Sequence, residues 1–349
     1  MHDFLILLPL LIIGSGAISL MLLSAYEKCS VENGANISMG FFAVAFFVQM
    51  LVGCSPQTAL FEQIFNGMLV SSTFTTVGSL VILGCGFFSA MASHTYFKVN
   101  RFNTLEFYSI MLFAACGMLL LCMAQELITA FIAIEIMSLS IYILVGYDRN
   151  SITAAQEILK YLMLGAFAGA FFVMGAALLF GATGTTHFAG IAKALAGSYA
   201  ATPLMIAGGF FLLIGLLFKV GAVPFHAWVI DVYEGAPMPV TGFMATALKA
   251  AAFCVFANFL ALHPAVHANW VTMLFWIALI TMFAGNFIAI GQTSLKRMLA
   301  ASGIVHTGYL LIALVAINSD QFTGSVIGYY LAAYGVSTVG MFAALSFLS

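Results

Sequence analysis

Residues 203–230, PLMIAGGFFLLIGLLFKVGAVPFHAWVI, form an apolar run long enough to cross a bilayer, yet the run contains a lysine and a proline. Lys219 lies well inside it, and Pro224 follows five residues later. Proline lacks an amide hydrogen and its ring clashes with the preceding turn, so it opens a helix. Irregular backbone at membrane depth is tolerated only inside protein or beside a wet cavity. The stretch therefore predicts a broken transmembrane helix whose lysine points into water.

The whole chain has the composition of a membrane protein. Of its 349 residues, 63% are hydrophobic and 6% are charged, and the mean hydropathy is +1.12. These values exclude a soluble globular domain. Because lipid-facing spans must satisfy their backbone groups internally, we expect an all-α polytopic membrane protein. Its eleven expected transmembrane helices cover residues 4–24, 37–53, 74–92, 105–123, 125–147, 156–181, 203–230, 239–262, 269–291, 297–318 and 322–348.

The basic residues outside these spans predict the orientation of the chain. Cytoplasmic loops carry an excess of Lys and Arg, and here the basic residues gather in the odd-numbered loops. Those loops contain Lys28, Lys98, Arg101, Arg149, Lys296 and Arg297, whereas the even-numbered loops contain only Lys193. We therefore expect the odd loops to be cytoplasmic and the N-terminus periplasmic. The first span lacks the flanks and cleavage site of a signal peptide, so we expect it to be retained.

No signature of a metal, redox or nucleotide site is visible in the sequence. The six cysteines have no paired spacing, and we interpret them as small apolar residues of the packing. They are Cys29, Cys54, Cys85, Cys116, Cys122 and Cys254. Neither a P-loop nor a dinucleotide-binding glycine pattern occurs between a strand and a helix. We expect no cofactor, metal or nucleic acid on this chain, so any redox chemistry must take place on another chain.

Four ionisable residues interrupt the expected spans, namely Glu135, Lys160, Lys219 and Lys249. Each costs about 2.5–3.5 kcal/mol at bilayer depth, or roughly 10–14 kcal/mol for the four. Such residues usually mark an ion or proton pathway. Lys219 and Lys249 are central in their spans and fit that interpretation best. Lys160 lies near the cytoplasmic end of its span, where the alternative is that its ammonium extends to the interface.

Further polar residues accompany these four. Ser138 and Tyr142 follow Glu135 at i+3 and i+7, which places a carboxylate and two hydroxyls on one helix face. The alternative role for this carboxyl is a simple hydrogen bond to a neighbouring helix. His226 and His306 suit a proton relay because histidine changes charge near neutral pH, although packing alone would explain them equally well. A separate pair, Asp231 and Glu234, is expected in a cytoplasmic loop, as solvated charges or as acceptors that brace it.

Residues 218–241, FKVGAVPFHAWVIDVYEGAPMPVT, resemble the hallmark of the antiporter-like membrane subunits of respiratory complex I. Within that family the chain is most similar to the N subunits of bacterial NADH:quinone oxidoreductases. Supporting stretches are residues 106–108, 135–142, 159–167, 181–185 and 295–300. The resemblance covers essentially the whole chain, and its long central motif is highly specific.

The resemblance implies a role for each member of a proton relay. In the family's pattern, Glu135 and Lys219 are the charged pair of the fifth and broken seventh helices. Lys160 is the modulating lysine of the sixth helix, and Lys249 is the central relay lysine of the eighth. His306 is the histidine of a Ser-Ser-Ile-x-His stretch. The second serine of that stretch is replaced here by Gly303, so one hydroxyl of the usual path is missing.

The resemblance also implies a repeat organisation. Members of this family have about fourteen helices, with inverted five-helix repeats from the fourth to the eighth and from the ninth to the thirteenth. We expect residues 1–104 to form an N-terminal three-helix segment, 105–262 a complete first repeat with the proton path, and 263–349 an incomplete second inverted repeat. The sequence is then a truncated product, one half of a split gene, or a partial sequence.

The function implied is that of a proton-translocating, multi-pass subunit of NADH:quinone oxidoreductase, a translocase of the bacterial inner membrane. NADH, flavin, iron–sulfur clusters and quinone would be bound by partner subunits. The partners would be adjacent antiporter-like and small helical membrane subunits, with the quinone pool reached through the complex. Two alternatives stay open: a subunit of an Mrp-type cation/proton antiporter, and a non-pumping assembly scaffold.

Overall fold

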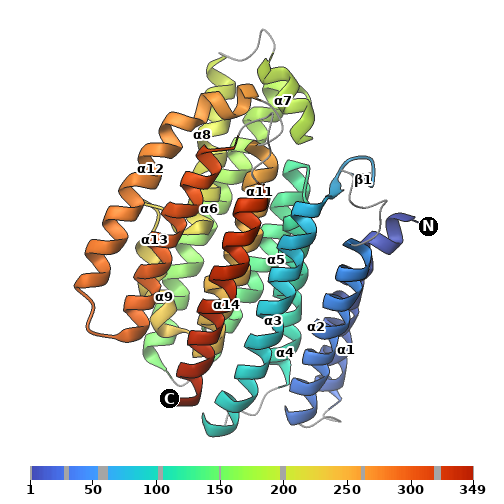
Figure 1. The fold of residues 1–349 in the computed structure, drawn as a ribbon, viewed down its shortest axis with the longest axis vertical. Helices are drawn as coiled ribbons and strands as arrows, with labels where there is room; N and C mark the ends of the chain where they lie inside the picture. Colours follow the sequence, from blue (N-terminus) through green and yellow to red (C-terminus); the bar gives the residue numbers. More distant parts are fainter. Residues whose placement is uncertain are drawn as a thin grey trace.

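The computed structural model describes residues 2–26, 31–53, 62–100, 105–148, 151–196, 202–260, 264–317 and 324–348. It is a bundle of long helices that run side by side along one axis (Figure 1). Eleven spans in this part of the chain are long and apolar enough to cross a membrane, which confirms the expected number. Ten begin and end as α1 His2–Ala25, α2 Val31–Gly53, α3 Thr73–Asn100, α4 Glu106–Met123, α5 Leu127–Val145, α6 Ile152–Thr183, α8 Pro203–Val220, α12 Pro264–Ile290, α13 Leu295–Val315 and α14 Gly324–Leu348.

The remaining span is the most deeply buried part of the bundle. It consists of α10 Met238–Phe243, a π-helical turn over Met244–Leu248, and α11 Lys249–Leu260. Every residue from 239 to 260 is buried, and the span contacts α3, α4, α8 and α14. α14 also packs against α3, so two helices that are distant in sequence lie side by side next to this central span (Figure 1). The division into segments 1–104, 105–262 and 263–349 stays a prediction.

The seventh span is shorter than its hydropathy suggests. The sequence predicts a helix over residues 203–230 with Lys219 well inside it, but α8 ends at Val220, so Lys219 is its penultimate residue. Gly221 ends the helix with a left-handed φ of 71°, a backbone conformation that favours glycine. A Cβ there would also lie 2.6 Å from a methyl of Val229. The break therefore begins three residues before Pro224, and the chain resumes helical structure at α9 Ala227–Gly235.

Side chains from three other elements satisfy the backbone groups at this break. The indole of Trp228 donates to the Phe218 carbonyl at 3.1 Å, and Thr307 of α13 donates to the Val220 carbonyl at 2.8 Å. The amide of Val223 donates to the Thr281 hydroxyl at 3.1 Å. An unpaired backbone group in an apolar interior is costly, so these bonds allow the chain to leave the helix inside the bundle.

Two short elements were not expected from hydropathy. A hairpin pairs β1 Glu62–Ile64 with β2 Leu69–Ser71, and its turn contains Phe65, Asn66 and Gly67 at positive φ. A short helix, α7 Phe188–Ala196, lies between α6 and α8 at the same end of the bundle (Figure 1). Both fall in loops that the sequence describes only as polar breaks.

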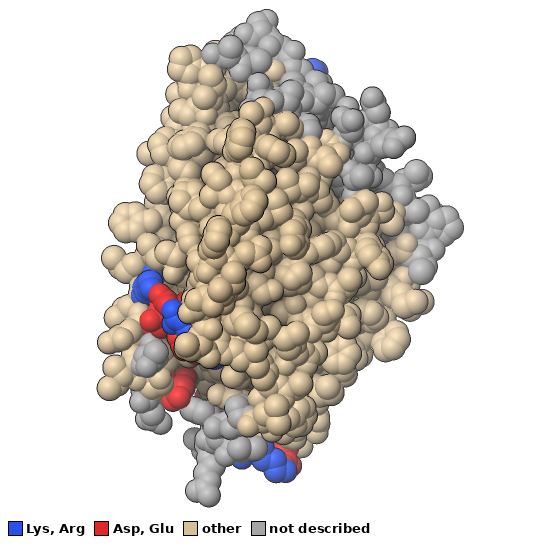
Figure 2. Space-filling view, turned by 60° about the vertical axis from the view of Figure 1, so that its left-hand side comes forward, with Lys and Arg blue, Asp and Glu red and all other residues tan. Residues whose placement is uncertain are grey.

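Charged side chains gather toward one end of the bundle, the lower end of Figure 2. Lys98 is in the last turn of α3, and Lys296 and Arg297 are in the first turn of α13, which both reach that end. Lys193 is on α7 at the other end. The positions of Lys28, Arg101, Arg149, Cys29 and Cys54 lie outside the described residues.

Candidate functional site

Lys219 is buried against α5, and its ammonium is bound by a hydroxyl. The side chain is 3% exposed and donates a hydrogen bond to Ser138 Oγ at 2.7 Å. Ser138 in turn donates to the Ile134 carbonyl of its own helix at 2.5 Å. The ammonium of Lys219 is thus shielded from bulk solvent, and contact with internal water stays a prediction. Lys219 is in the last turn of α8, which packs against α6, and its ammonium reaches a polar atom of α5 inside the protein.

Glu135 lies one turn before Ser138 on α5, but it forms no ion pair with Lys219 within the described part of the chain. Its side chain is partly exposed and faces α6, where one carboxylate oxygen lies 3.1 Å from the place that a Cβ on Gly169 would occupy. Ser138, one turn after Glu135 on α5, is the residue that binds the ammonium of Lys219. The two residues that the family pattern pairs are not in direct contact.

Aromatic rings surround the Lys219 site. The Tyr142 ring is 6.0 Å from Lys219 Nζ and packs edge-on against Tyr161 at 4.7 Å between centroids. Tyr161 stacks on Trp228, the residue that also binds the broken end of α8. These bulky rings have few rotamers open to them in a packed interior, so they hold the break and the lysine in one arrangement.

Lys160 belongs to a different cluster. It forms an ion pair with Asp231, which also lies 3.3 Å from Arg297 Nη2, and Arg297 bonds Glu234 as well. Asp231 and Glu234 are on α9, not in a loop as expected, and they tie α9 to α6 and α13. The Lys160 and Asp231 side chains are 39% and 26% exposed, so this cluster lies near the surface. No hydrogen bond or ion pair among the described residues joins it to Lys219.

Lys249 begins α11 immediately after the π-helical turn. It is 2% exposed, and its ammonium donates to the backbone carbonyl of Gly303 on α13. Nζ also lies 5.8 Å from the centre of the Tyr334 ring on α14. π-Helical turns occur frequently at functional sites, because the extra residue changes where a side chain points. Here the turn precedes Lys249, the least exposed charged residue in the described part of the chain.

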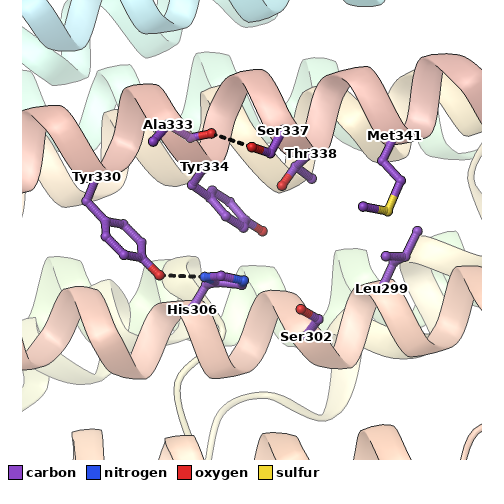
Figure 3. A pocket seen from close by; sticks show the side chains of 9 residues that line it. All are labelled: Leu299, Ser302, His306, Tyr330, Ala333, Tyr334, Ser337, Thr338 and Met341. Atoms are coloured by element: carbon purple, nitrogen blue, oxygen red, sulfur yellow. Dashed lines mark hydrogen bonds between the residues drawn. The ribbon is translucent and has the colours of Figure 1, made fainter.

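His306 faces a cavity of about 290 Å³ between α13 and α14 (Figure 3). Its Nδ1 lies 2.5 Å from the hydroxyl of Tyr330, and its ring packs against Tyr334 at 4.6 Å between centroids. The cavity is lined by Leu299, Ser302, His306, Tyr330, Ala333, Tyr334, Ser337, Thr338 and Met341. The sequence singled out His306 but neither tyrosine.

His226 lies apart from both lysines. It precedes α9, and its Nδ1 is buried with no hydrogen-bond partner among the described residues. The structure thus arranges the predicted residues in three groups: Glu135 with Lys219, Lys249 with His306, and Lys160 with the α9 carboxylates. The described residues contain no group of three or more His, Cys, Asp or Glu side chains that could hold a metal ion.

The sequence profile of the family described as NADH:quinone oxidoreductase/Mrp antiporter, TM, matches residues 124–349. Subunit N of the NADH-quinone oxidoreductase of Myxococcus xanthus is 39% identical over 378 residues, which cover 99% of this chain and 72% of that protein. The chain belongs to the NADH-quinone oxidoreductase subunit N family. The family member of Salinibacter ruber is also 39% identical, and there the match covers 85% of this chain and 58% of the relative. The chain thus spans only part of the length of the relatives it matches.

Solved structures show the same fold. A chain of respiratory complex I from Thermus thermophilus superimposes with a TM-score of 0.79 and 31% identity, over 97% of this chain and 70% of the other. A chain of the Mrp complex from Dietzia sp. DQ12-45-1b superimposes with a TM-score of 0.84 over 99% of this chain and 64% of the other. At 17% identity, the latter likeness concerns the fold alone.

Proposed function

We propose that this chain is a proton-translocating subunit of a bacterial NADH:quinone oxidoreductase, respiratory complex I. The observation that carries the proposal is the pair of fully buried lysines, Lys219 and Lys249, each bound to a neutral oxygen. A hydroxyl such as that of Ser138 can either accept from an ammonium or donate to an amine. Lys219 can therefore release and regain a proton without losing its partner, which a relay requires.

Glu135 supplies the switch in this proposal. In the present conformation its ion pair with Lys219 is open. If the carboxylate turned toward the ammonium, a contact at about 4 Å would contribute roughly 4 kcal/mol at an effective dielectric constant near 20. Moving one charge against 100 mV costs about 2.3 kcal/mol, so closing and opening this pair is large enough to drive a proton. The proton passes from Lys219 to Lys249 and then to His306.

Lys160 modulates the relay from the α9 cluster, because α9 follows directly on the break that positions Lys219. Electron transfer takes place on partner subunits that bind NADH, flavin, iron–sulfur clusters and quinone. The partners of this chain are antiporter-like and small helical membrane subunits. The chain lies in the bacterial inner membrane, with the end that carries Lys98 and Arg297 in the cytoplasm and the N-terminus in the periplasm.

The experiment compares Glu135→Gln, Lys219→Ala and Lys249→Ala in the assembled complex. We expect each to lower proton pumping and quinone-coupled NADH oxidation, while NADH oxidation by an artificial acceptor at the flavin stays normal. Lys193→Ala, an exposed lysine on α7, is the control and should change neither rate. Normal coupled turnover in all three relay variants would remove the function from this chain and leave the assembly scaffold as its role.

The family whose profile matches residues 124–349 also includes Mrp antiporters, so a second candidate is a subunit of a cation/proton antiporter. The two differ in their partners and their driving ion. Complex I predicts purification of the chain with quinone-reductase subunits and NADH-driven proton flux. Antiport predicts Na⁺ or K⁺ flux that depends on an imposed pH gradient and needs no NADH.

A further inference from the structure

Tyr334 stands between the two members of the second group, Lys249 and His306. It is buried on α14, with Lys249 Nζ 5.8 Å from its ring centre and the His306 ring 4.6 Å away. No hydrogen bond joins Lys249 directly to His306 in the part of the chain that the structure describes. A proton that leaves Lys249 for the histidine therefore needs an intermediate group, and Tyr334 is the side chain that contacts both.

Gly303 provides the space in which the ammonium and the phenol approach each other. A Cβ built on Gly303 would lie 3.0 Å from Lys249 Nζ and 3.3 Å from the Tyr334 hydroxyl. Both polar atoms thus border the same small volume, which a side chain at position 303 would occupy. The backbone carbonyl of this glycine holds the ammonium there.

On its other side, Tyr334 borders the cavity between α13 and α14 (Figure 3). Ser302, Ser337 and Thr338 contribute hydroxyls to its lining, and its volume of about 290 Å³ is enough for several water molecules. Nδ1 of His306 is bound to Tyr330, so Nε2 is the ring nitrogen that can exchange a proton with the cavity. Tyr334 therefore lies between a buried lysine and a cavity that has hydroxyl groups in its lining.

We propose that the Tyr334 hydroxyl passes protons between Lys249 and the cavity that contains His306. The phenol oxygen accepts a proton from the Lys249 ammonium as the phenol gives its own proton to a cavity water or to His306 Nε2. Lys249 becomes a neutral amine, the tyrosine is unchanged, and one positive charge moves into the cavity. This inference rests on the proposed relay function, and it adds two residues, Tyr334 and Gly303, to that relay.

Tyr334→Phe removes the hydroxyl and keeps the ring, so it tests the proposal in the assembled complex. We expect coupled proton pumping to fall roughly tenfold or more, the solvent deuterium isotope effect on turnover to increase, and the artificial-acceptor rate to stay normal. Tyr329→Phe is the matched control, since Tyr329 is on the same helix and 78% exposed. Equal pumping in the two variants would overturn the proposal.

Gly303 allows a rescue that a purely structural role of Tyr334 does not predict. In the Tyr334→Phe background, Gly303→Ser places a hydroxyl beside Lys249 near the volume that the phenol oxygen vacates, whereas Gly303→Ala adds only a methyl. We expect partial recovery of pumping with serine and none with alanine. Identical results for serine and alanine would contradict the relay.

With Tyr334 intact, Gly303→Ala puts a methyl between the ammonium and the phenol, and we expect it to lower coupled turnover even where Tyr334→Phe does not assemble. Wild-type turnover in Gly303→Ala would overturn the proposal.

Lys249→Ala distinguishes a failure of the role of Tyr334 from a failure of the proposed function. If it abolishes pumping while Tyr334→Phe does not, only the role of Tyr334 fails. If Lys249→Ala itself pumps normally, the proposed function fails with it.

Discussion

The hydroxyl of Thr307 on α13 donates to the carbonyl of Val220, the last residue of α8, at 2.8 Å. Val220 directly follows Lys219, so this bond fixes the backbone from which the lysine extends. The same hydroxyl lies 3.1 Å from the carbonyl of Gly303, the group that accepts from Lys249. One threonine thus contacts the backbone that positions each of the two buried lysines, which otherwise share no contact in the described structure.

Thr307→Val keeps the shape of the side chain and removes this donor. The buried Val220 carbonyl then lacks its side-chain partner, and we expect a loss of about 1–3 kcal/mol in stability. Coupled turnover should fall as well, because Lys219 loses its fixed backbone. Thermal unfolding and pumping of the assembled complex measure the two effects. Ser15→Ala, which removes an exposed hydroxyl bonded within its own helix, is the control. Unaltered stability and turnover in Thr307→Val would contradict the role assigned to this bond.

Ser138→Ala removes the one side-chain oxygen among the described residues that forms a hydrogen bond with the Lys219 ammonium. A hydrogen bond to a charged group contributes about 1.5–3 kcal/mol, so we expect coupled turnover to fall by roughly ten- to a hundredfold. Ser140→Ala is a matched control, because Ser140 is on the same helix and bonds only the Ile136 carbonyl of its own helix. Similar rates for the two alanine variants would show that Ser138 does not act through Lys219.

The spans could be predicted from the sequence because their length and hydropathy follow from the thickness of the bilayer. The end of α8 could not be placed as accurately. Pro224 was the visible helix breaker, but the helix ends where Gly221 adopts a left-handed conformation, and the unpaired carbonyls are then satisfied by Trp228 and Thr307. Thr307 is distant in sequence, so this partner depends on how α13 packs.

In the candidate site too, the contacts between distant segments could not be predicted from the sequence. Charge at membrane depth identified Lys219 and Lys249 without any knowledge of packing. Tyr330 and Tyr334 gave no comparable signal, because tyrosine is common in membrane helices and its role depends on the side chain it faces across a helix pair. The charge of Lys160 was visible in the sequence, but its ion-pair partner was not. That partner, Asp231, lies on the short helix α9, which the hydropathy pattern divided between a span and a loop.

Asp231→Asn breaks the ion pairs that join α9 to Lys160 and Arg297. Because these side chains are about one quarter to two fifths exposed, we expect the stability to change by no more than about 1 kcal/mol. The expected functional change is larger, since α9 follows the break beside Lys219. Coupled turnover, measured as a function of salt, should become less salt-dependent in the variant. Glu32→Gln breaks the exposed pair with Lys98 and is the control. A turnover profile identical to that of Glu32→Gln would exclude a modulating role for the α9 cluster.

The orientation of the chain can be tested at two described lysines at opposite ends of the bundle. Lys98 is in the last turn of α3, at the end where charged side chains gather, and Lys193 is on α7 at the other end (Figure 1). If the odd loops are cytoplasmic, a cysteine in place of Lys98 should react with a membrane-impermeant maleimide only in inverted membrane vesicles. A cysteine in place of Lys193 should react only in intact spheroplasts. A chain without either substitution shows how far the natural cysteines contribute. Four of these are described as free thiols, and three of the four are buried. The opposite labelling pattern would reverse the orientation, and protons released into the cavity beside His306 would then have to be assigned to the other side of the membrane.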